Sequence, residues 1–146
     1  MRRFFIAMMV AVLSVVTMSA RDRYSRNVSD LPTAAQSFIQ NNFKAKVSLI
    51  KIDKGTFGGT DYDVVLTDGS ELEFDGKGNW KEIEVPRGKQ VPNTIVPAGA
   101  QTYIKANHKG SKVLGIERDR SGYKVTLDNG IEMMLSNRGD FLRYDD

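Results

Sequence analysis

Residues 62–80 read YDVVLTDGSELEFDGKGNW, and residues 123–141 read YKVTLDNGIEMMLSNRGDF. Aligned without a gap, the two stretches match at 6 of 19 positions. In each, apolar residues alternate with polar ones around an Asp-Gly or Asn-Gly pair, the pattern that favours a β-hairpin closed by a two-residue turn. A second glycine-containing turn, at 75–79 and 136–140, leads to a last strand at 80–85 and 141–144. The chain is therefore expected to form the same strand meander twice.

The match continues on the N-terminal side of both stretches. Residues 31–42 (LPTAAQSFIQNN) and 96–107 (VPAGAQTYIKAN) share 5 of 12 positions, and residues 46–53 and 112–119 share 4 of 8. In total 15 of 39 positions match, where unrelated segments of ordinary composition would share about two or three. A proline in the first turn and apolar residues at helical spacing predict a helix in each copy, with Asp30 as the first N-cap. We infer an internal duplication.

These observations predict an α+β fold, a tandem duplication of helix-plus-four-strand units with an antiparallel sheet and helices on one face. The predicted organisation is a signal peptide at 1–20, a polar leader at 21–30, a first repeat at 31–85, a connector at 86–94 and a second repeat at 95–146. The two repeats together are expected to form one domain.

The first twenty residues have the pattern of a secretory signal peptide. A basic start is followed by an apolar run at 4–16 and by small residues at 17–20. About 13 apolar residues are too few to span a bilayer comfortably, which disfavours a retained anchor. We expect cleavage near Ala20 or Arg21, and a periplasmic or secreted protein without membrane insertion after signal removal. The chain has no Cys, which excludes the bacterial lipoprotein route.

Composition excludes several kinds of chemistry. Without Cys, and with one His, the chain cannot form disulfides, Cys-ligated zinc sites, iron–sulfur clusters or multi-His metal centres. Removal of the signal peptide would change 21 basic and 18 acidic residues to 19 and 18, a net charge of +1. This near-neutral balance gives no electrostatic indication of nucleic-acid or anionic-membrane binding. No cofactor, metal or catalytic residue is predicted.

Strand alternation predicts which face of the sheet is free. Residues at alternate strand positions are expected under the helices: Tyr62, Val64, Leu66, Leu72, Phe74, Ile83 and Val85 in the first repeat, and Tyr123, Val125, Leu127, Ile131, Met133, Leu135, Leu142 and Tyr144 in the second. Trp80 and Phe141 each lie two residues before Glu82 and Arg143, which are expected to face outward. Alternation therefore predicts that Trp80 and Phe141 face outward too. Two outward aromatics with a polar rim resemble a binding surface, although each could instead cap a sheet edge or cover the preceding glycine. The predicted interaction face comprises Trp80, Glu82, Phe141, Arg143, Met134 and Lys124.

Other motifs have simpler interpretations. His108 follows the second predicted helix without a partner at catalytic spacing, so a helix-end role is expected. Residues 75–79 (DGKGN) and 138–140 (RGD) occupy equivalent turns, which favours a turn over a calcium loop or an adhesion motif. Residues 54–60 form a glycine-rich insertion in which Phe57 could make a contact.

The signal peptide, the repeated helix and the segment from Phe74 to Trp80 resemble the PepSY-like, beta-lactamase-inhibitor-like family of small secreted or periplasmic bacterial proteins. The resemblance covers residues 27–146 and implies the same helix-plus-four-strand units. The family's name reflects likeness of fold to an inhibitor, and fold likeness does not transfer inhibition. No inhibitory loop is carried over, because the chain has no motif that matches one.

We therefore expect a non-enzymatic envelope binding module that uses an open sheet face for an unknown envelope protein, peptide or small ligand, an inhibitor-like role included. Two alternatives stay open. One is a carboxylate-dependent hydrolase, which would need a pocket holding carboxylates of perturbed pKa. The other is a structural or stress-related envelope protein with no specific ligand.

Overall fold

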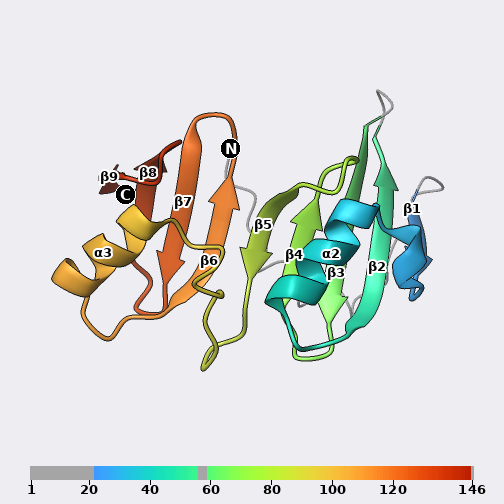
Figure 1. The fold of residues 1–146 in the computed structure, drawn as a ribbon, viewed down its shortest axis with the longest axis horizontal. Helices are drawn as coiled ribbons and strands as arrows, with labels where there is room; N and C mark the ends of the chain where they lie inside the picture. The colour runs from blue at the N-terminus through green and yellow to red at the C-terminus, as the bar shows by residue number, and fades with distance from the viewer. Residues whose placement is uncertain (1–21, 56–58, 146) are drawn as a thin grey trace.

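The computed structural model describes residues 22–55 and 59–145, in which two α-helices and nine strands form (Figure 1). Each helix is followed by four strands, in the predicted order, and a short strand and a 3-10 helix precede the first helix. The elements are β1 (Asp22–Ser25), η1 (Val28–Asp30), α2 (Thr33–Asn42), β2 (Val47–Lys54), β3 (Thr60–Leu66), β4 (Glu71–Phe74), β5 (Trp80–Glu84), α3 (Ala98–Asn107), β6 (Val113–Arg118), β7 (Gly122–Leu127), β8 (Glu132–Ser136) and β9 (Phe141–Tyr144).

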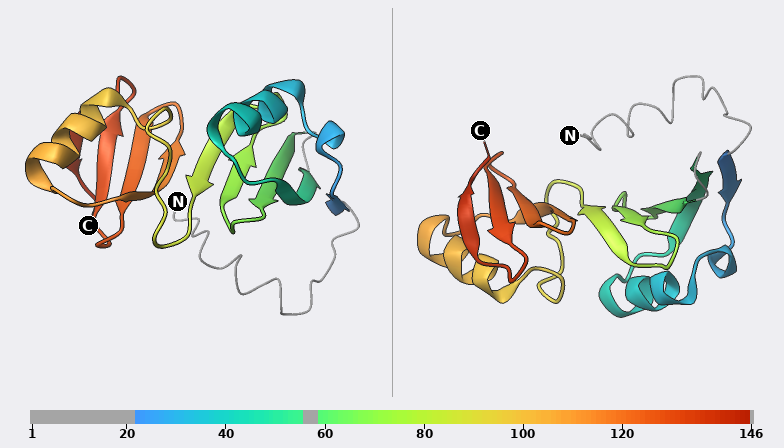
Figure 2. Two further views of the ribbon diagram at one scale, coloured as in Figure 1. Left: turned by 60° about the horizontal axis from the view of Figure 1, so that its bottom comes forward. Right: turned by 90° about the horizontal axis from the view of Figure 1, so that it is seen from above.

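The strands form one antiparallel sheet in which each strand pairs with its neighbours in the sequence, from β1 to β9. Both helices lie on the same side of this sheet (Figure 2). We call the helix-covered face the inner face and the opposite face the outer face. The α+β class and the antiparallel sheet predicted from the sequence are confirmed.

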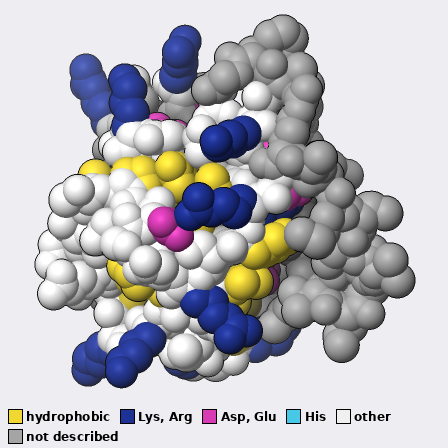
Figure 3. Space-filling model, turned by 90° about the vertical axis from the view of Figure 1, so that its right-hand side faces the viewer, with side chains coloured by type: hydrophobic (Ala, Val, Ile, Leu, Met, Phe, Trp, Pro, Cys, Tyr) yellow, Lys and Arg dark blue, Asp and Glu magenta, His cyan; other side chains and the backbone are white. Residues whose placement is uncertain are grey.

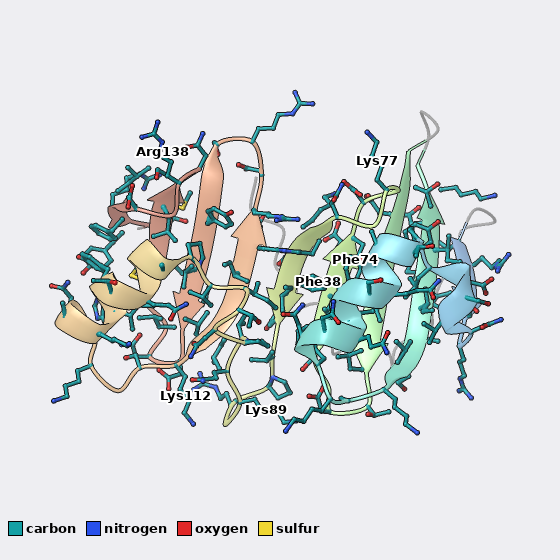
Figure 4. The ribbon with its side chains drawn as sticks, viewed as in Figure 1. Phe38, Phe74, Lys77, Lys89, Lys112 and Arg138 are labelled. Atoms are coloured by element: carbon teal, nitrogen blue, oxygen red, sulfur yellow. The ribbon has the colours of Figure 1, made fainter. Side chains whose placement is uncertain are left out.

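The core lies between the helices and the inner face. Ala35 and Ile39 of α2, and Ala100 and Ile104 of α3, are buried against the sheet. Phe38 of α2 packs edge-on against Phe74 of β4, with ring centroids 5.7 Å apart (Figure 4). The strand residues beneath the helices are those that alternation predicted, and they are almost fully buried: Val64, Leu66, Leu72, Val125, Leu127, Met133 and Leu135.

A β-bulge reverses the alternation at the start of β5 and again in β9. Glu73 pairs with Glu82 but Phe74 pairs with Trp80, which leaves Lys81 as an extra residue. In the same way Met134 pairs with Arg143 and Leu135 with Phe141, which leaves Leu142 as an extra residue. One inserted residue moves the preceding side chain to the other face. Trp80 and Phe141 therefore point to the inner face, and the prediction that they face outward is wrong.

The segment predicted as a polar leader contains regular structure. Residues 22–25 form β1, which pairs with β2 at the edge of the sheet. Asp30 was expected to cap the first helix, but Pro32 is at that position and makes no side-chain cap. The Asp30 carboxylate instead accepts a hydrogen bond from Ser25 and forms a 2.9 Å ion pair with Arg23. Asp30 thus fastens the edge strand to η1, which explains why it does not cap α2.

Two glycine turns contact the helices at equivalent places. Gly78 and Gly139 both have a φ of 87°, a conformation that side-chain-bearing residues rarely adopt. A Cβ on Gly78 would lie 2.8 Å from the backbone nitrogen of Ala35, and one on Gly139 would lie 2.4 Å from Cβ of Pro97. The turns can therefore approach the start of each helix only with glycine at these positions.

The two helix-and-four-strand units join where β5 pairs with β6, over three residue pairs. Beyond these pairs, Arg118 Nε donates a 2.7 Å hydrogen bond to the carbonyl of Trp80. The connector is also fastened, because Val91 is buried and its N–H donates to Val113. No helix in residues 22–55 or 59–145 is long and apolar enough to cross a membrane. The predicted signal peptide lies outside the described residues.

Candidate functional site on the outer face of the sheet

Four carboxylates lie side by side across the middle of the outer face. Each pairs directly with the next across neighbouring strands: Asp63 with Glu73, Glu73 with Glu82, and Glu82 with Glu117. We call these four residues the carboxylate row. A lysine ends the row on each side, because Lys51 pairs with Asp63 and Lys124 pairs with Glu117.

A second line of residues runs parallel to the carboxylate row, two positions further along the strands. Glu71 pairs with Glu84, and the line then continues through Gly115 and Thr126 to Glu132. Because the glycine and the threonine are small, the outer face is hollowed at this point. The hollow has a volume of ≈ 850 Å³, and its lining includes Glu82, Glu84, Gly115, Glu117, Thr126 and Met134.

Few positive charges balance these carboxylates. Lys81 lies 3.3 Å from a Glu73 oxygen and 3.5 Å from an Asp61 oxygen. Within the described part of the chain, Asp63, Glu71, Glu82, Glu84 and Glu117 make no ion pair within 4.0 Å. Like charges directly opposite each other destabilise a sheet. The outer face therefore concentrates acidic groups at a cost in stability.

Burial, and then the proximity of the other carboxylates, raises the pKa of these groups. Burial and the neighbouring Glu117 raise the pKa of Glu82 to about 8. Burial and Glu84 raise the pKa of Glu71 to about 7, and burial and Glu73 raise the pKa of Asp63 to about 6. Each of these carboxylates would be ionised more readily if a positive group were placed beside it.

Positive charge gathers elsewhere on the molecule. At the end formed by β1, several Lys and Arg side chains stand out on the surface, with a smaller acidic patch among them (Figure 3). Arg23 at this end is largely exposed.

The predicted interaction face is only partly assembled. Successive cross-strand pairs place Glu82, Lys124, Met134 and Arg143 on the outer face, separated only by Glu117 between the first two. Lys124 forms ion pairs of 2.9 Å with Glu132 and 3.0 Å with Asp145, both on the same side of the sheet. The structure does not place Trp80 and Phe141 with them.

Trp80 is 7% exposed and lies in the core. Its ring stacks on Phe38 of α2, with centroids 6.3 Å apart. The Arg118 guanidinium carbon lies 4.0 Å from the Trp80 ring centroid on the side of the second unit. Trp80 therefore joins α2 to the junction between β5 and β6, a structural position rather than a surface one.

Phe141 has an equivalent role in the second unit. Its ring stacks on Tyr103 of α3, with centroids 3.9 Å apart and planes at 7°. Tyr144, which follows in β9, lies with its hydroxyl 2.9 Å from that of Tyr103 and 3.0 Å from Nε2 of His108. His108 is the C-cap of α3, at the helix end as expected from the sequence, and helps to hold the last strand. Leu142 was expected inward and is 61% exposed.

A signal for both bulges is present in the sequence. Apolar residues within a regular strand recur at even separations, yet Trp80 and Ile83 are three residues apart, as are Phe141 and Tyr144. This odd spacing indicates an inserted residue. The carboxylate row was missed for another reason: Glu117 belongs to the second unit, and alternation within one unit gives no register between β5 and β6.

The remaining motifs are turns or lie outside the described residues. One Asp75 carboxylate oxygen accepts hydrogen bonds of 2.9 Å from the N–H groups of Lys77 and Asn79, so the interpretation of residues 75–79 as a turn is confirmed. Residues 138–140 lie in the equivalent turn. Phe57 lies outside the described residues. Across 22–55 and 59–145, no three Asp, Glu or His residues come together as metal ligands.

Three solved structures share this fold over nearly their whole length. One, from Bacteroides vulgatus, is described as a periplasmic protein of unknown function; it is 46% identical, with 86% of this chain and 99% of that chain covered and a TM-score of 0.80. A second periplasmic protein of the same organism is 34% identical, with 88% and 100% covered and a TM-score of 0.78. A third, from Bacteroides thetaiotaomicron, is described as a calcium-regulated periplasmic protein; it is 36% identical, with 86% and 97% covered and a TM-score of 0.78.

No curated protein matches the chain. A family model described as beta-lactamase-inhibitor-like, PepSY-like matches residues 60–143, which run from β3 through most of β9 and include the carboxylate row and the hollow. The match agrees with the resemblance that the sequence motifs carry. With more than half of the chain matched, and with relatives above 30% identity that it covers almost completely, the chain belongs to the PepSY-like, beta-lactamase-inhibitor-like family.

Proposed function

We propose that this protein is a non-enzymatic binding module of the cell envelope that takes a protein or peptide partner on the outer face of its sheet. The carboxylate row is the observation that carries the proposal. Four carboxylates stand directly opposite one another, where they lower stability, and a local arrangement that opposes folding is typical of a functional surface.

The size of the surface favours a polypeptide over a small ligand. Neighbouring strands are about 4.8 Å apart, so the carboxylate row extends about 14 Å from β3 to β6. Glu71, Glu84 and the hollow widen this surface to two lines of residues. A small ligand would neutralise one carboxylate pair, whereas a chain segment can pair with the row as a whole.

The site of action follows from the family and the sequence together. The relatives are described as periplasmic proteins, and the first twenty residues have the pattern of a signal peptide. We infer that the mature chain begins near Arg21 and works in the periplasm or outside the cell. We also infer that its two units arose by duplication of one helix and four strands, which is supported by the repeated element order.

Calcium regulation is not carried over from the third relative. The described residues bring no three potential ligands together, and the Asp75 carboxylate is used by its own turn. These groups do not fit a calcium site, which requires six to eight oxygen ligands around one point. We therefore include no metal in the proposal.

Charge-neutralising variants test the proposal. The mature chain, a Glu82→Gln/Glu117→Gln variant and an Asp140→Asn control would be used to capture proteins from an envelope extract. Asp140 is exposed in the turn before β9 and does not lie on the outer face. We expect proteins captured by the wild type and by the control to be lost with the double variant. Identical captures by all three proteins would refute the proposal.

A carboxylate-dependent hydrolase remains a second candidate, favoured by the raised pKa of Glu82 at the edge of the hollow. Such a carboxyl could act as a general acid near neutral pH. The row runs straight across the strands, however, whereas an acid and base pair must converge on one bond. Release of nitrophenol from a panel of nitrophenyl glycosides, abolished by Glu82→Gln, would support catalysis. No turnover by the wild type would count against glycoside hydrolysis.

A further inference from the structure

The outer face has a distinct order of charges along one line. From β1 to β9 the cross-strand partners are Tyr24, Lys51, the four residues of the carboxylate row, Lys124, Met134 and Arg143. The negative stretch is therefore limited to four strands and has a positive residue at each end. A partner that matches this line must carry positive charge over a limited length.

The spacing of the carboxylates points to the shape of that partner. We propose, on the basis of the proposed function, that the partner segment is an α-helix lying across the strands, with four Lys or Arg side chains on one face above the carboxylate row. Residues three or four apart on a helix lie on one face and advance about 5.4 Å per turn. That repeat is close to the separation of about 4.8 Å between neighbouring strands.

An extended segment fits less well. Alternate residues of a strand point the same way and are about 6.7 Å apart, so four of them span about 20 Å. The corresponding four residues of a helix, at positions i, i+4, i+7 and i+11, span about 16 Å at a rise of 1.5 Å per residue. The carboxylate row extends about 14 Å, a difference that flexible Lys and Arg side chains can absorb from a helix.

The flanking residues set the length of the basic stretch. A fifth or sixth basic residue on the same helix face would lie above Lys51 or Lys124. The carboxylates nearest to these lysines, Asp22 on one side and Glu132 and Asp145 on the other, already pair with them, so the added residue would gain no partner. Beyond Lys124 the line reaches Met134, and in the first unit Leu49 and Val65 pair on the outer face beside the row. The partner helix is therefore expected to carry apolar or acidic residues outside its four basic positions.

Three synthetic peptides of equal length, each with four Lys residues, test this proposal. The first is an alanine-rich helix with Lys at i, i+4, i+7 and i+11. The second distributes the same four Lys residues around the helix, and the third places them at alternate positions between two prolines. Binding to the mature chain would be measured by fluorescence anisotropy at physiological salt.

We expect the first peptide to bind at least tenfold more tightly than the other two. Glu82→Gln should weaken its binding, while Asp140→Asn should not. Adding two further Lys residues to the same helix face should give no gain in affinity. Circular dichroism of both variants would show that each remains folded.

Two results would overturn the helix proposal and leave the proposed function intact. One is equal affinity of all three peptides together with sensitivity to Glu82→Gln, which would mean that the face attracts positive charge without regard to spacing. The other is no binding of any peptide while envelope proteins are still captured through Glu82 and Glu117. If the captures also fail to depend on those two residues, both proposals are wrong.

Discussion

Replacing Trp80 by alanine distinguishes a buried tryptophan from a surface one. Truncating a buried Trp or Phe to Ala costs about 3–5 kcal/mol of unfolding free energy. Trp80 is 7% exposed, stacks on Phe38 and carries the guanidinium of Arg118 at 4.0 Å. Loss of the cation–π contact alone is worth about 0.5–1 kcal/mol. We therefore expect Trp80→Ala to cost about 4–5 kcal/mol, near the upper end of the range.

Urea unfolding of the mature chain, followed by far-ultraviolet circular dichroism, would measure this change without relying on the fluorescence of the removed residue. Leu142→Ala is the matched control, because Leu142 is 61% exposed at a bulge of the same kind; its cost should stay within about 0.5 kcal/mol. Trp80→Phe, which keeps an aromatic ring, provides an intermediate if the alanine variant does not fold. A loss below about 1 kcal/mol for Trp80→Ala would refute the inward orientation.

Three further predictions concern pH, the unit junction and a turn. Folding raises the pKa of Glu82 from 4.5 to about 8, so the folded state holds more protons than the unfolded state between these pH values. The free energy of unfolding, measured by urea titration, should therefore fall from pH 5 to pH 8, and it should fall less in Glu82→Gln. Arg118→Ala removes a hydrogen bond from a charged donor to the Trp80 carbonyl and should lower the midpoint of urea unfolding by the equivalent of about 1.5–3 kcal/mol; an unchanged midpoint would mean that the junction does not need it. Gly78→Ala should destabilise the chain more than Gly88→Ala in thermal unfolding. Both glycines have a positive φ, but only at Gly78 would the added Cβ lie 2.8 Å from a backbone atom. Equal losses would show that the turn can move away from the helix.

Alternation and turn motifs were sufficient to predict the strands that lie between two glycine turns. Val64 and Leu72 in the first unit, like Val125 and Met133 in the second, are buried as expected. The predicted two-residue turn is wrong: Leu66 N–H donates to Ser70 and Leu127 N–H to Ile131, so three residues form each turn, with only its glycine at a positive φ. The same reasoning failed after the second turn, since alternation was extended through Lys81 without allowing for an inserted residue. A bulge changes the face of a side chain without changing the composition of the strand.

The candidate site was predictable in part. The acidic residues of the outer face were visible in the sequence, and Glu82 was placed there correctly by alternation with Ile83 within its own strand. Their alignment with Glu117 depends on how β5 meets β6, which is set by tertiary contacts such as that between Arg118 and Trp80. Glu82 and Glu117 stand opposite each other because of the register between the two units. The sequence pattern of one strand does not determine that register.

The strand order has a consequence for how the molecule assembles. Every strand pairs with the strand before it and the strand after it in the chain, and only β1–β2 and β5–β6 are separated by a helix. Most of the sheet can therefore grow from segments that are close in the sequence. Proteins rich in such local contacts have a low relative contact order and fold faster than β-sandwiches of similar size. A chain that emerges N-terminus first from a secretion channel could then add strands one after another. Stopped-flow refolding of the mature chain should accordingly show one fast phase, on the millisecond timescale typical of mixed α/β domains.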